Sequence, residues 1–355
     1  MLANLEKGNP LILKGSPFER GLLQAKLCPE MIEPVRNNIL SQLSEYKELL
    51  QLDKITSYLE QQTKITNELF PEVFGEIKGI AKGFALSIAN LFSFYHLRIV
   101  RDMDGCTTWA VSLPHQGAIV GKNRDLAANN QVFQRVFLHD DADWKGRKIL
   151  SVGSLGAPCA YSSGINSDGF CLADTNILTS DHGLGACRYF LMPFLLATCN
   201  SVDQALKKIS ELPHAGGGSL TLADGNEKIT IVELGHHDLN VKKETDWLAI
   251  TNHFTSRKLA PSNLRSGRQL EIENSEDRLR YTSSKMPGIY QDFSLEQATE
   301  IMKNHSQPGG LCRHGESNAS STISGSLYTC WNRKLYFSDG NPCDSLWYEF
   351  SFSSD

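Results

Sequence analysis

A cysteine that directly follows a glycine, at the start of a β-rich segment, constrains this chain more than any other feature. The stretch is Asp104-Gly105-Cys106-Thr107-Thr108-Trp109, and Asp125 follows nineteen residues after the cysteine. The thiol of such a cysteine can attack the carbonyl carbon of the residue before it, because glycine has no Cβ to block the approach and tolerates strained backbone angles. The sequence therefore predicts a chain that cuts itself between Gly105 and Cys106.

Self-cleavage would leave Cys106 as a new N-terminus that carries both a thiol and a free α-amino group. An α-amine has a pKa of about 7.7 to 8.0, and an ordinary thiol has a pKa of about 8.5. Since the two values are so close, the amine can accept the thiol proton at neutral pH and activate the nucleophile. No separate catalytic histidine is then required.

The pattern of apolar residues divides the chain into a helical first part and a mixed remainder. From Pro17 to about Arg101, apolar residues recur at three- and four-residue steps, which predicts helices. Further helices are expected at 188–199, 202–212, 266–281 and 295–304, and strands at 107–113, 117–121, 132–139, 148–152, 169–173, 219–223, 228–234, 247–251, 321–329, 334–338 and 345–351. Strands grouped in sets with helices between them indicate mainly antiparallel sheets flanked by helices, an α+β fold.

Charge and composition argue against several classes of partner. The net charge is −5 and the basic residues form no run that would hold phosphates, so no nucleic acid is expected as a partner. The first fifteen residues contain no apolar core of a secretory signal, and the longest apolar stretch, Tyr189–Cys199, is too short to span a bilayer. We therefore expect a cytoplasmic protein with no membrane partner.

The cysteines and the missing motifs narrow the chemistry further. The nine cysteines form no C-x-x-C pair and no Cys/His spacing typical of zinc, so we expect mostly free thiols in a reducing compartment, with no metal and no other cofactor. The chain also lacks the G-x-S-x-G, G-x-x-x-x-G-K-[ST] and H-E-x-x-H motifs. Serine hydrolases, nucleotide-driven enzymes and zinc metalloproteases are therefore disfavoured.

Three motifs occur in order: Asp104-Gly105-Cys106-Thr107-Thr108, Gly121-Lys122-Asn123-Arg124-Asp125 and Thr251-Asn252-His253-Phe254. With the helical segment before them and Tyr336–Cys343 near the end, they make the chain resemble the penicillin acyltransferase-like family (acyl-CoA:6-aminopenicillanic acid acyltransferase, peptidase C45) of N-terminal nucleophile hydrolases. The resemblance covers nearly the whole chain. It implies an αββα four-layer sandwich, with 1–105 as a helical leader that stays attached as a small subunit and 106–355 as the core.

The resemblance also implies roles for individual residues. In the family the matching cysteine performs both self-cleavage and catalysis, which assigns both roles to Cys106. Asp125 matches an aspartate that orients the new α-amine and the thiol by hydrogen bonds. Asn252 matches an asparagine whose side-chain amide helps to form the oxyanion hole, and such a donor is worth about 2.7 to 4 kcal/mol in the transition state.

Five further residues are expected to bind substrate or to support the site: Thr107, Lys122, Arg124, His253 and Arg313. More distant bile-salt hydrolase and acid ceramidase relatives carry an arginine three residues before the aspartate, where this chain has Lys122. Either Lys122 or Arg124 is therefore expected to take the positive role. Arg313 matches a family segment near the active site, whereas His253 is also consistent with a purely structural role.

The main hypothesis is a self-processing amide hydrolase or acyltransferase that acts on a small N-acyl or acyl-thioester compound. Hydrolysis is preferred over transfer, because water needs no dedicated acceptor site. Two alternatives stay open: an uncut papain-like enzyme in which Cys106 pairs with His253, and a binding protein of the same fold without activity. The sequence makes no prediction of an oligomer.

Overall fold

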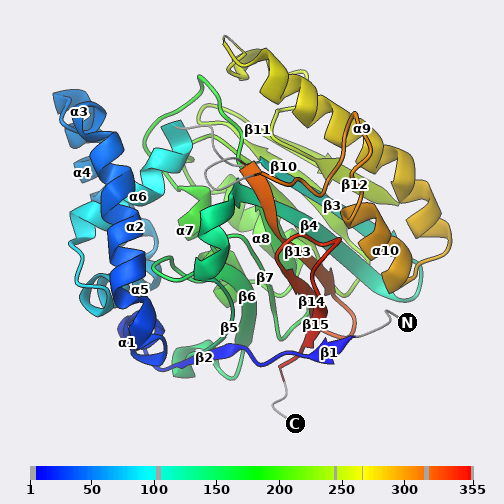
Figure 1. Ribbon diagram of the computed structural model, residues 1–355, viewed down its shortest axis with the longest axis horizontal. Helices are drawn as coiled ribbons and strands as arrows, with labels where there is room; N and C mark the ends of the chain where they lie inside the picture. The colour runs from blue at the N-terminus through cyan, green and yellow to red at the C-terminus, as the bar shows by residue number, and fades with distance from the viewer. Residues whose placement is uncertain (1–4, 101–104, 244–245, 266, 316–319, 353–355) are drawn as a thin grey trace.

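Two β-sheets stack face to face, and helices cover the outer side of each sheet (Figure 1). The computed structural model describes residues 5–100, 105–243, 246–265, 267–315 and 320–352. Asp104, in the first of the sequence motifs, lies outside the described residues. The predicted αββα arrangement is confirmed.

The first sheet has seven strands in the order β1-β15-β14-β13-β4-β3-β12. These are β1 (Glu6–Lys7), β3 (Gly105–Leu113), β4 (Gly117–Ala127), β12 (Trp247–Ile250), β13 (Ser320–Thr329), β14 (Lys334–Asp339) and β15 (Trp347–Phe350). Neighbouring strands are antiparallel except β1 and β15, which are parallel. The long strands β3 and β4 lie next to each other near one edge of this sheet.

The second sheet has eight strands in the order β11-β10-β9-β8-β7-β6-β5-β2. These are β2 (Leu11–Lys14), β5 (Gln134–Asp140), β6 (Lys148–Ser154), β7 (Ser163–Asn166), β8 (Cys171–Thr175), β9 (Ser219–Ala223), β10 (Ile229–Leu234) and β11 (Leu239–Lys243). Here only β2 and β5 run parallel.

Helices form the two outer layers. They are α1 (Pro17–Leu27), α2 (Ile32–Glu45), α3 (Lys47–Leu50), α4 (Asp53–Leu69), α5 (Pro71–Gly83), α6 (Ile88–Val100), α7 (Arg188–Thr198), α8 (Val202–Ser210), α9 (Gln269–Gln291) and α10 (Leu295–Met302). Short 3-10 turns occupy Pro29–Met31, Ala128–Phe133, Ala142–Trp144 and Ala260–Ser262. The first helix begins where the sequence predicts it, because Ser16 and Glu19 form a capping box around Pro17.

Strand alternation sorts the side chains of β3 between two apolar layers. Ala110 points into the layer between the sheets and packs with residues of the second sheet such as Val152. Its neighbours Trp109 and Val111 point outward and pack against α9 and α10, where they join a cluster that includes Met286 of α9. A third apolar layer joins the other face of the second sheet to the helices α1, α2 and α5 to α8.

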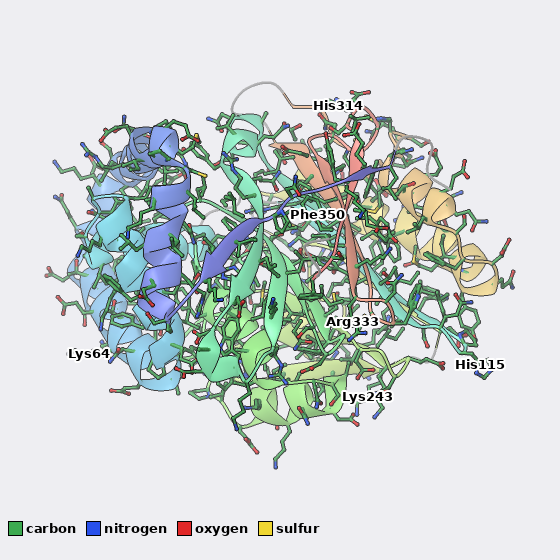
Figure 2. All side chains as sticks on the ribbon, turned by 90° about the horizontal axis from the view of Figure 1, so that it is seen from below. Lys64, His115, Lys243, His314, Arg333 and Phe350 are labelled. Atoms are coloured by element: carbon green, nitrogen blue, oxygen red, sulfur yellow. The ribbon has the colours of Figure 1, made fainter. Side chains whose placement is uncertain are left out.

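The segment before α1 holds two strands that the sequence analysis did not predict. β1 adds to the first sheet beside β15, and β2 adds to the second sheet beside β5. Figure 2 shows this segment crossing from the helical layer towards Phe350. The strands have two and four residues, too short for a recognisable alternation. The expected helical leader therefore also contributes an edge strand to each sheet.

Four other elements differ from the prediction. β7 and β11 were not predicted. β4 runs on to Ala127 although a strand was expected only over 117–121, because its second half is buried polar sequence. α9 ends at Gln291 and not near 281, although Pro287 removes a backbone donor. Met286 and Ile289 are buried in that last part, and their burial offsets the cost. None of the described helices combines the length and the apolar character that a membrane span requires.

Candidate active site

The hairpin of β3 and β4 explains the nineteen-residue spacing between the cysteine and the aspartate. In its antiparallel register Gly105 lies opposite Asp125, and Cys106 lies opposite Arg124. Both partners in such a pair point to the same face of the sheet. The side chain of Cys106 therefore shares the inner face with Arg124, while Asp125 lies on the outer face beside Gly105.

Asp125 is fully buried against Gly105. Its Oδ1 accepts a hydrogen bond of 2.6 Å from the Thr322 hydroxyl, and Oδ2 lies 3.8 Å from the guanidinium of Arg313. A Cβ at position 105 would lie only 2.8 Å from Oδ2. Burial raises the pKa of Asp125, although Arg313 and Arg278 act in the opposite direction. The aspartate thus faces the bond before the cysteine and not the thiol.

The backbone of Cys106 is held on both sides by long-range contacts. Its N–H donates to Asn252 Oδ1 at 2.9 Å, and its carbonyl accepts from Arg278 Nη1 at 2.8 Å. Asn252 reaches this position because β12 pairs with β3 and ends two residues before it, with Ile250 opposite Thr108. Cys106 itself is only 6% exposed. The nitrogen that would become the α-amine therefore already has a side-chain acceptor.

Arg278 is the main site residue that the sequence analysis missed. It is buried and also donates to Thr107 Oγ1 at 2.9 Å and to Asn252 Oδ1 at 2.7 Å. Burial lowers its pKa to about 10, and Arg313 acts in the same direction. A signal was available in the sequence, since Arg278 continues the three- and four-residue steps of the buried face of α9: Ile272, Ser275, Arg278, Thr282, Met286 and Ile289.

The side-chain amide of Asn252, expected as an oxyanion donor, makes other contacts in this conformation. Its Nδ2 donates to the carbonyl of Asn176 at 2.8 Å, while its Oδ1 accepts from Cys106 and Arg278. The Asn252 amide nitrogen carries two N–H donors, and the Asn176 carbonyl takes one of them.

On the inner face, Lys122 belongs to a buried group of charges. Its Nζ lies 2.5 Å from Asp174 Oδ1, and Arg188 Nε lies 2.9 Å from the other oxygen of the same carboxylate. Burial would raise the pKa of Asp174, but the two cations hold it below its ordinary value. Arg124 donates instead to Gln134 Oε1 and to Ser154, at 3.1 Å each. Asp174 and Arg188 had no recognisable signal in the sequence.

Cys106 opens into a small cavity between the two sheets. The cavity has a volume of about 20 Å³ and is lined by Cys106, Lys122, Arg124, Leu126, Tyr161, Ser162, Asp174, Asn176, Arg188 and Tyr189. This space holds about one water molecule. Both candidates for the positive role, Lys122 and Arg124, lie in its wall, and a substrate can enter only if lining side chains move.

His253 is buried beside α9. Its Nδ1 lies 2.8 Å from Ser275 Oγ, and burial lowers its pKa. Arg313, in contrast, is joined to the site, because its backbone N–H donates to Thr322, the residue that holds Asp125. The structure thus brings eight of the nine residues selected from the sequence together around β3 and β4, on two faces of one sheet, whereas His253 contacts Thr251 and Ser275 beside α9.

The comparisons with known proteins give one family and several distant structures. The profile of the family described as acyl-coenzyme A:6-aminopenicillanic acid acyl-transferase matches residues 112–344, about two thirds of the chain. The match begins six residues after Cys106 and includes Asp125, Asn252 and Arg278. No curated protein matches the chain.

Three solved structures are similar to 70% of this chain at low sequence identity. Two are variants of conjugated bile acid hydrolase from Clostridium perfringens: a cysteine-to-alanine mutant, 13% identical with a TM-score of 0.43, and an arginine-to-leucine variant, 14% identical with a TM-score of 0.45. Both are covered over 97% of their length. Penicillin V acylase from Agrobacterium tumefaciens is 11% identical with a TM-score of 0.47, and 87% of it is covered. These similarities are too distant to assign a role to a residue.

Proposed function

The chain belongs to the acyl-coenzyme A:6-aminopenicillanic acid acyl-transferase family and is an enzyme that hydrolyses amides or transfers acyl groups, and from this premise we propose that Cys106 is its nucleophile and is exposed by self-cleavage. The observation that supports this most is the set of contacts around the backbone of Gly105 and Cys106. Asp125 faces Gly105, Asn252 accepts from the Cys106 N–H, and Arg278 donates to the Cys106 carbonyl.

In the first step the thiol of Cys106 attacks the carbonyl carbon of Gly105. A carbon–sulfur bond forms, the carbon–nitrogen bond breaks, and the thiol proton passes to the nitrogen of Cys106. Water then hydrolyses the thioester, which leaves a carboxylate on Gly105 and regenerates the thiol. Asp125 lies on the outer face, where its carboxyl group can guide the proton to the leaving nitrogen.

After the cut, the contact with Asn252 Oδ1 would hold the α-amine of Cys106 in place. The guanidiniums of Arg278 and Arg313 lie near this amine and favour its neutral form, which is the form that acts as a base. On the inner face, Lys122 and Arg124 stabilise the negative charge of the thiolate. The second N–H of the Asn252 amide then serves as the oxyanion donor.

The substrate is a small linear amide or an acyl thioester. Its acyl carbon is attacked by Cys106, the amine or thiol leaves with a proton from the α-amine, and water or a second amine takes the acyl group. Hydrolysis is the preferred outcome. Within the part of the chain that the structure describes, the cysteines form no disulfide, which supports a reducing, cytoplasmic location.

The leader, residues 1–105, is expected to stay bound to the core, residues 106–355, after the cut. β1 and β2 each hydrogen-bond to a strand of the core, and apolar residues of α5 and α6 such as Phe92 pack against α7. The leader chain is therefore a permanent partner of the core.

The test is the denatured mass of freshly purified protein. In proportion to 105 of 355 residues and a total of 39.4 kDa, cleavage gives fragments of about 12 and about 28 kDa. We expect both fragments in the wild type and in a Cys28→Ala control, which changes a buried cysteine in the leader. We expect a single chain in Cys106→Ala. A wild type that stays uncut contradicts the proposal.

The papain-like alternative has a separate signature. It requires an intact, active chain whose activity disappears in His253→Ala, although the ring of His253 is engaged with Ser275 in this structure.

A second experiment distinguishes hydrolysis from acyl transfer. Cleaved protein is screened with N-acyl amines, N-acyl amino acids and acyl thioesters, with and without added acceptor amines.

A further inference from the structure

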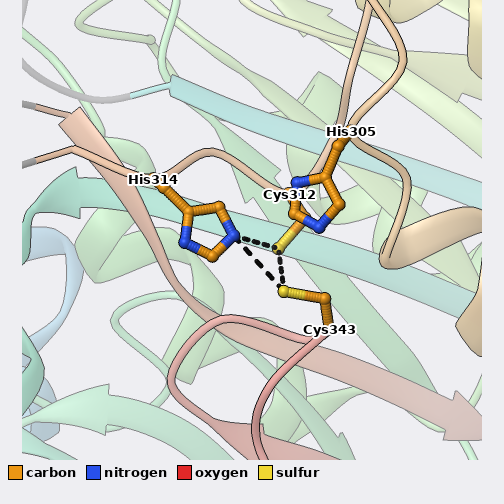
Figure 3. Close-up of side chains that lie close together, drawn as sticks. All are labelled: His305, Cys312, His314 and Cys343. Atoms are coloured by element: carbon orange, nitrogen blue, oxygen red, sulfur yellow. Dashed lines mark hydrogen bonds between the residues drawn. The ribbon is translucent and has the colours of Figure 1, made fainter.

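Two thiols and two imidazoles converge at the end of the first sheet (Figure 3). His305 follows α10, Cys312 and His314 lie in the segment before β13, and Cys343 lies between β14 and β15. The two sulfur atoms are 3.6 Å apart, and His314 Nε2 lies 3.8 Å from Cys312 Sγ and 3.3 Å from Cys343 Sγ. The four possible ligand atoms all lie within 4.8 Å of one another.

The three distances among Cys312, His314 and Cys343 match the edges of a tetrahedron around a metal ion, and the ligand atom of His305 lies within 4.8 Å of these three. Zinc binds thiolate sulfur at about 2.3 Å and imidazole nitrogen at about 2.0 to 2.1 Å, so ideal tetrahedral angles separate two sulfurs by about 3.8 Å and a sulfur from a nitrogen by about 3.6 Å. The corresponding separations here are within a few tenths of an ångström of these values. The donor set of two cysteines and two histidines is one that zinc prefers in structural sites.

The segments that carry the ligands are held in place by contacts outside the cluster. The N–H of Cys312 donates to the carbonyl of Asn304, the residue before His305, at 2.9 Å. Asn341, two residues before Cys343, donates through its side chain to the carbonyl of Arg313 at 2.7 Å. These contacts hold the segments that carry the ligands close together. His305 and His314 are exposed, which provides a path for entry, and His314 lies at the edge of the molecule in Figure 2.

We propose that His305, Cys312, His314 and Cys343 bind one zinc ion in a closed tetrahedral site. Four protein ligands leave no open position for water or substrate, so the metal has a structural and not a catalytic role. This inference does not depend on the identity of the nucleophile.

The position of the site suggests what the metal stabilises. Arg313 lies between two of the ligands, approaches Asp125 to 3.8 Å, and donates through its N–H to Thr322. Zinc would fix the segment Cys312–His314 and with it the guanidinium beside Asp125. Loss of the metal is therefore expected to change the surroundings of the Asp125 carboxylate and to leave the cavity beside Cys106 unchanged.

The first experiment measures the metal content of full-length protein purified under reducing conditions, by elemental mass spectrometry. We expect about one zinc per chain in the wild type and in the Cys28→Ser control, and loss of zinc in Cys343→Ser. His314→Ala changes an exposed residue, and the zinc affinity of this variant is expected to fall at least about tenfold in a competition with a chromophoric chelator.

Replacement of zinc by Co²⁺ gives a second readout that is independent of activity. A site with two thiolates in tetrahedral geometry produces strong visible bands and a sulfur-to-cobalt charge-transfer band, which should be present in the wild type and absent in Cys343→Ser. The proposal is overturned if the wild type takes up no zinc or cobalt, if Cys343→Ser and His314→Ala bind zinc as tightly as the wild type, or if Cys312 and Cys343 form a disulfide in the freshly purified protein.

Discussion

Replacing Gly105 by alanine tests whether the bond before Cys106 is positioned by Asp125. The new methyl group would lie 2.8 Å from Asp125 Oδ2, 2.8 Å from Arg313 Nη1 and 3.3 Å from Asp125 Cβ. Arg313 is partly exposed and can move away. Asp125 cannot do so easily, because it is fully buried and its other oxygen is held by Thr322 at 2.6 Å.

The size of the effect follows from this contact. The φ angle of Gly105 is not in the positive range that demands glycine, so the cost of alanine is steric. Forcing a methyl group into a well-packed site costs about 1 to 3 kcal/mol. If Asp125 must regain its position beside residue 105 in the transition state of self-cleavage, this cost is added to the barrier and the rate falls about five- to 150-fold.

The assay follows newly synthesised full-length chain in a cell-free reaction and records the appearance of the two fragments with time. Gly153→Ala is the matched control, since Gly153 is also a buried strand glycine but its added methyl group would meet no atom closer than 3.5 Å. The reasoning is refuted if Gly105→Ala cleaves within about twofold of the wild type, or if Gly153→Ala slows cleavage as much.

Three further predictions concern charges buried around the site and in the leader. Thr322→Val removes the hydroxyl that holds Asp125, so the pKa of that carboxyl rises further. The pH of half-maximal cleavage then shifts upward by about 1 to 2 units in a pH–rate series. An unchanged profile contradicts the role of ionised Asp125. Arg278→Lys keeps the charge but loses at least one charge-assisted bond on each side of Cys106, and the free energy of unfolding should fall by about 3 kcal/mol in urea. Burial raises the pKa of Glu76 from 4.5 to about 7, so the folded state binds an extra proton between these values and stability is lost as pH rises towards and through about 7, by up to about 3 kcal/mol. Glu76→Gln should flatten this dependence between pH 5 and 8, and equal slopes in both proteins would rule out this interpretation.

Local pattern was enough to predict strands over 107–113 and 117–121, which a short turn joins into the hairpin of β3 and β4. Local pattern did not extend the second strand to Asp125. It was not enough to predict which face each side chain would take. The register puts Asp125 with Gly105 and Arg124 with Cys106, and a shift of one residue would exchange the faces. The expectation that the aspartate contacts both the amine and the thiol could not be refined without that register.

The sequence by itself determined the order of helices and strands, the grouping that indicates an α+β fold, and the candidate nucleophile with its carboxylate. The first two depend on periodicity, the nucleophile depends on the glycine before it, and its carboxylate depends on the resemblance to a family. Only the tertiary structure decided that Arg278 contacts the Cys106 carbonyl, that Lys122 pairs with Asp174, and that His305 and Cys343 meet across 38 positions. A charged or polar side chain in a sequence is expected at the surface. It can be buried only where segments far apart in the chain supply hydrogen-bond or ion-pair partners that offset its loss of water, and these partners are known only from the tertiary structure.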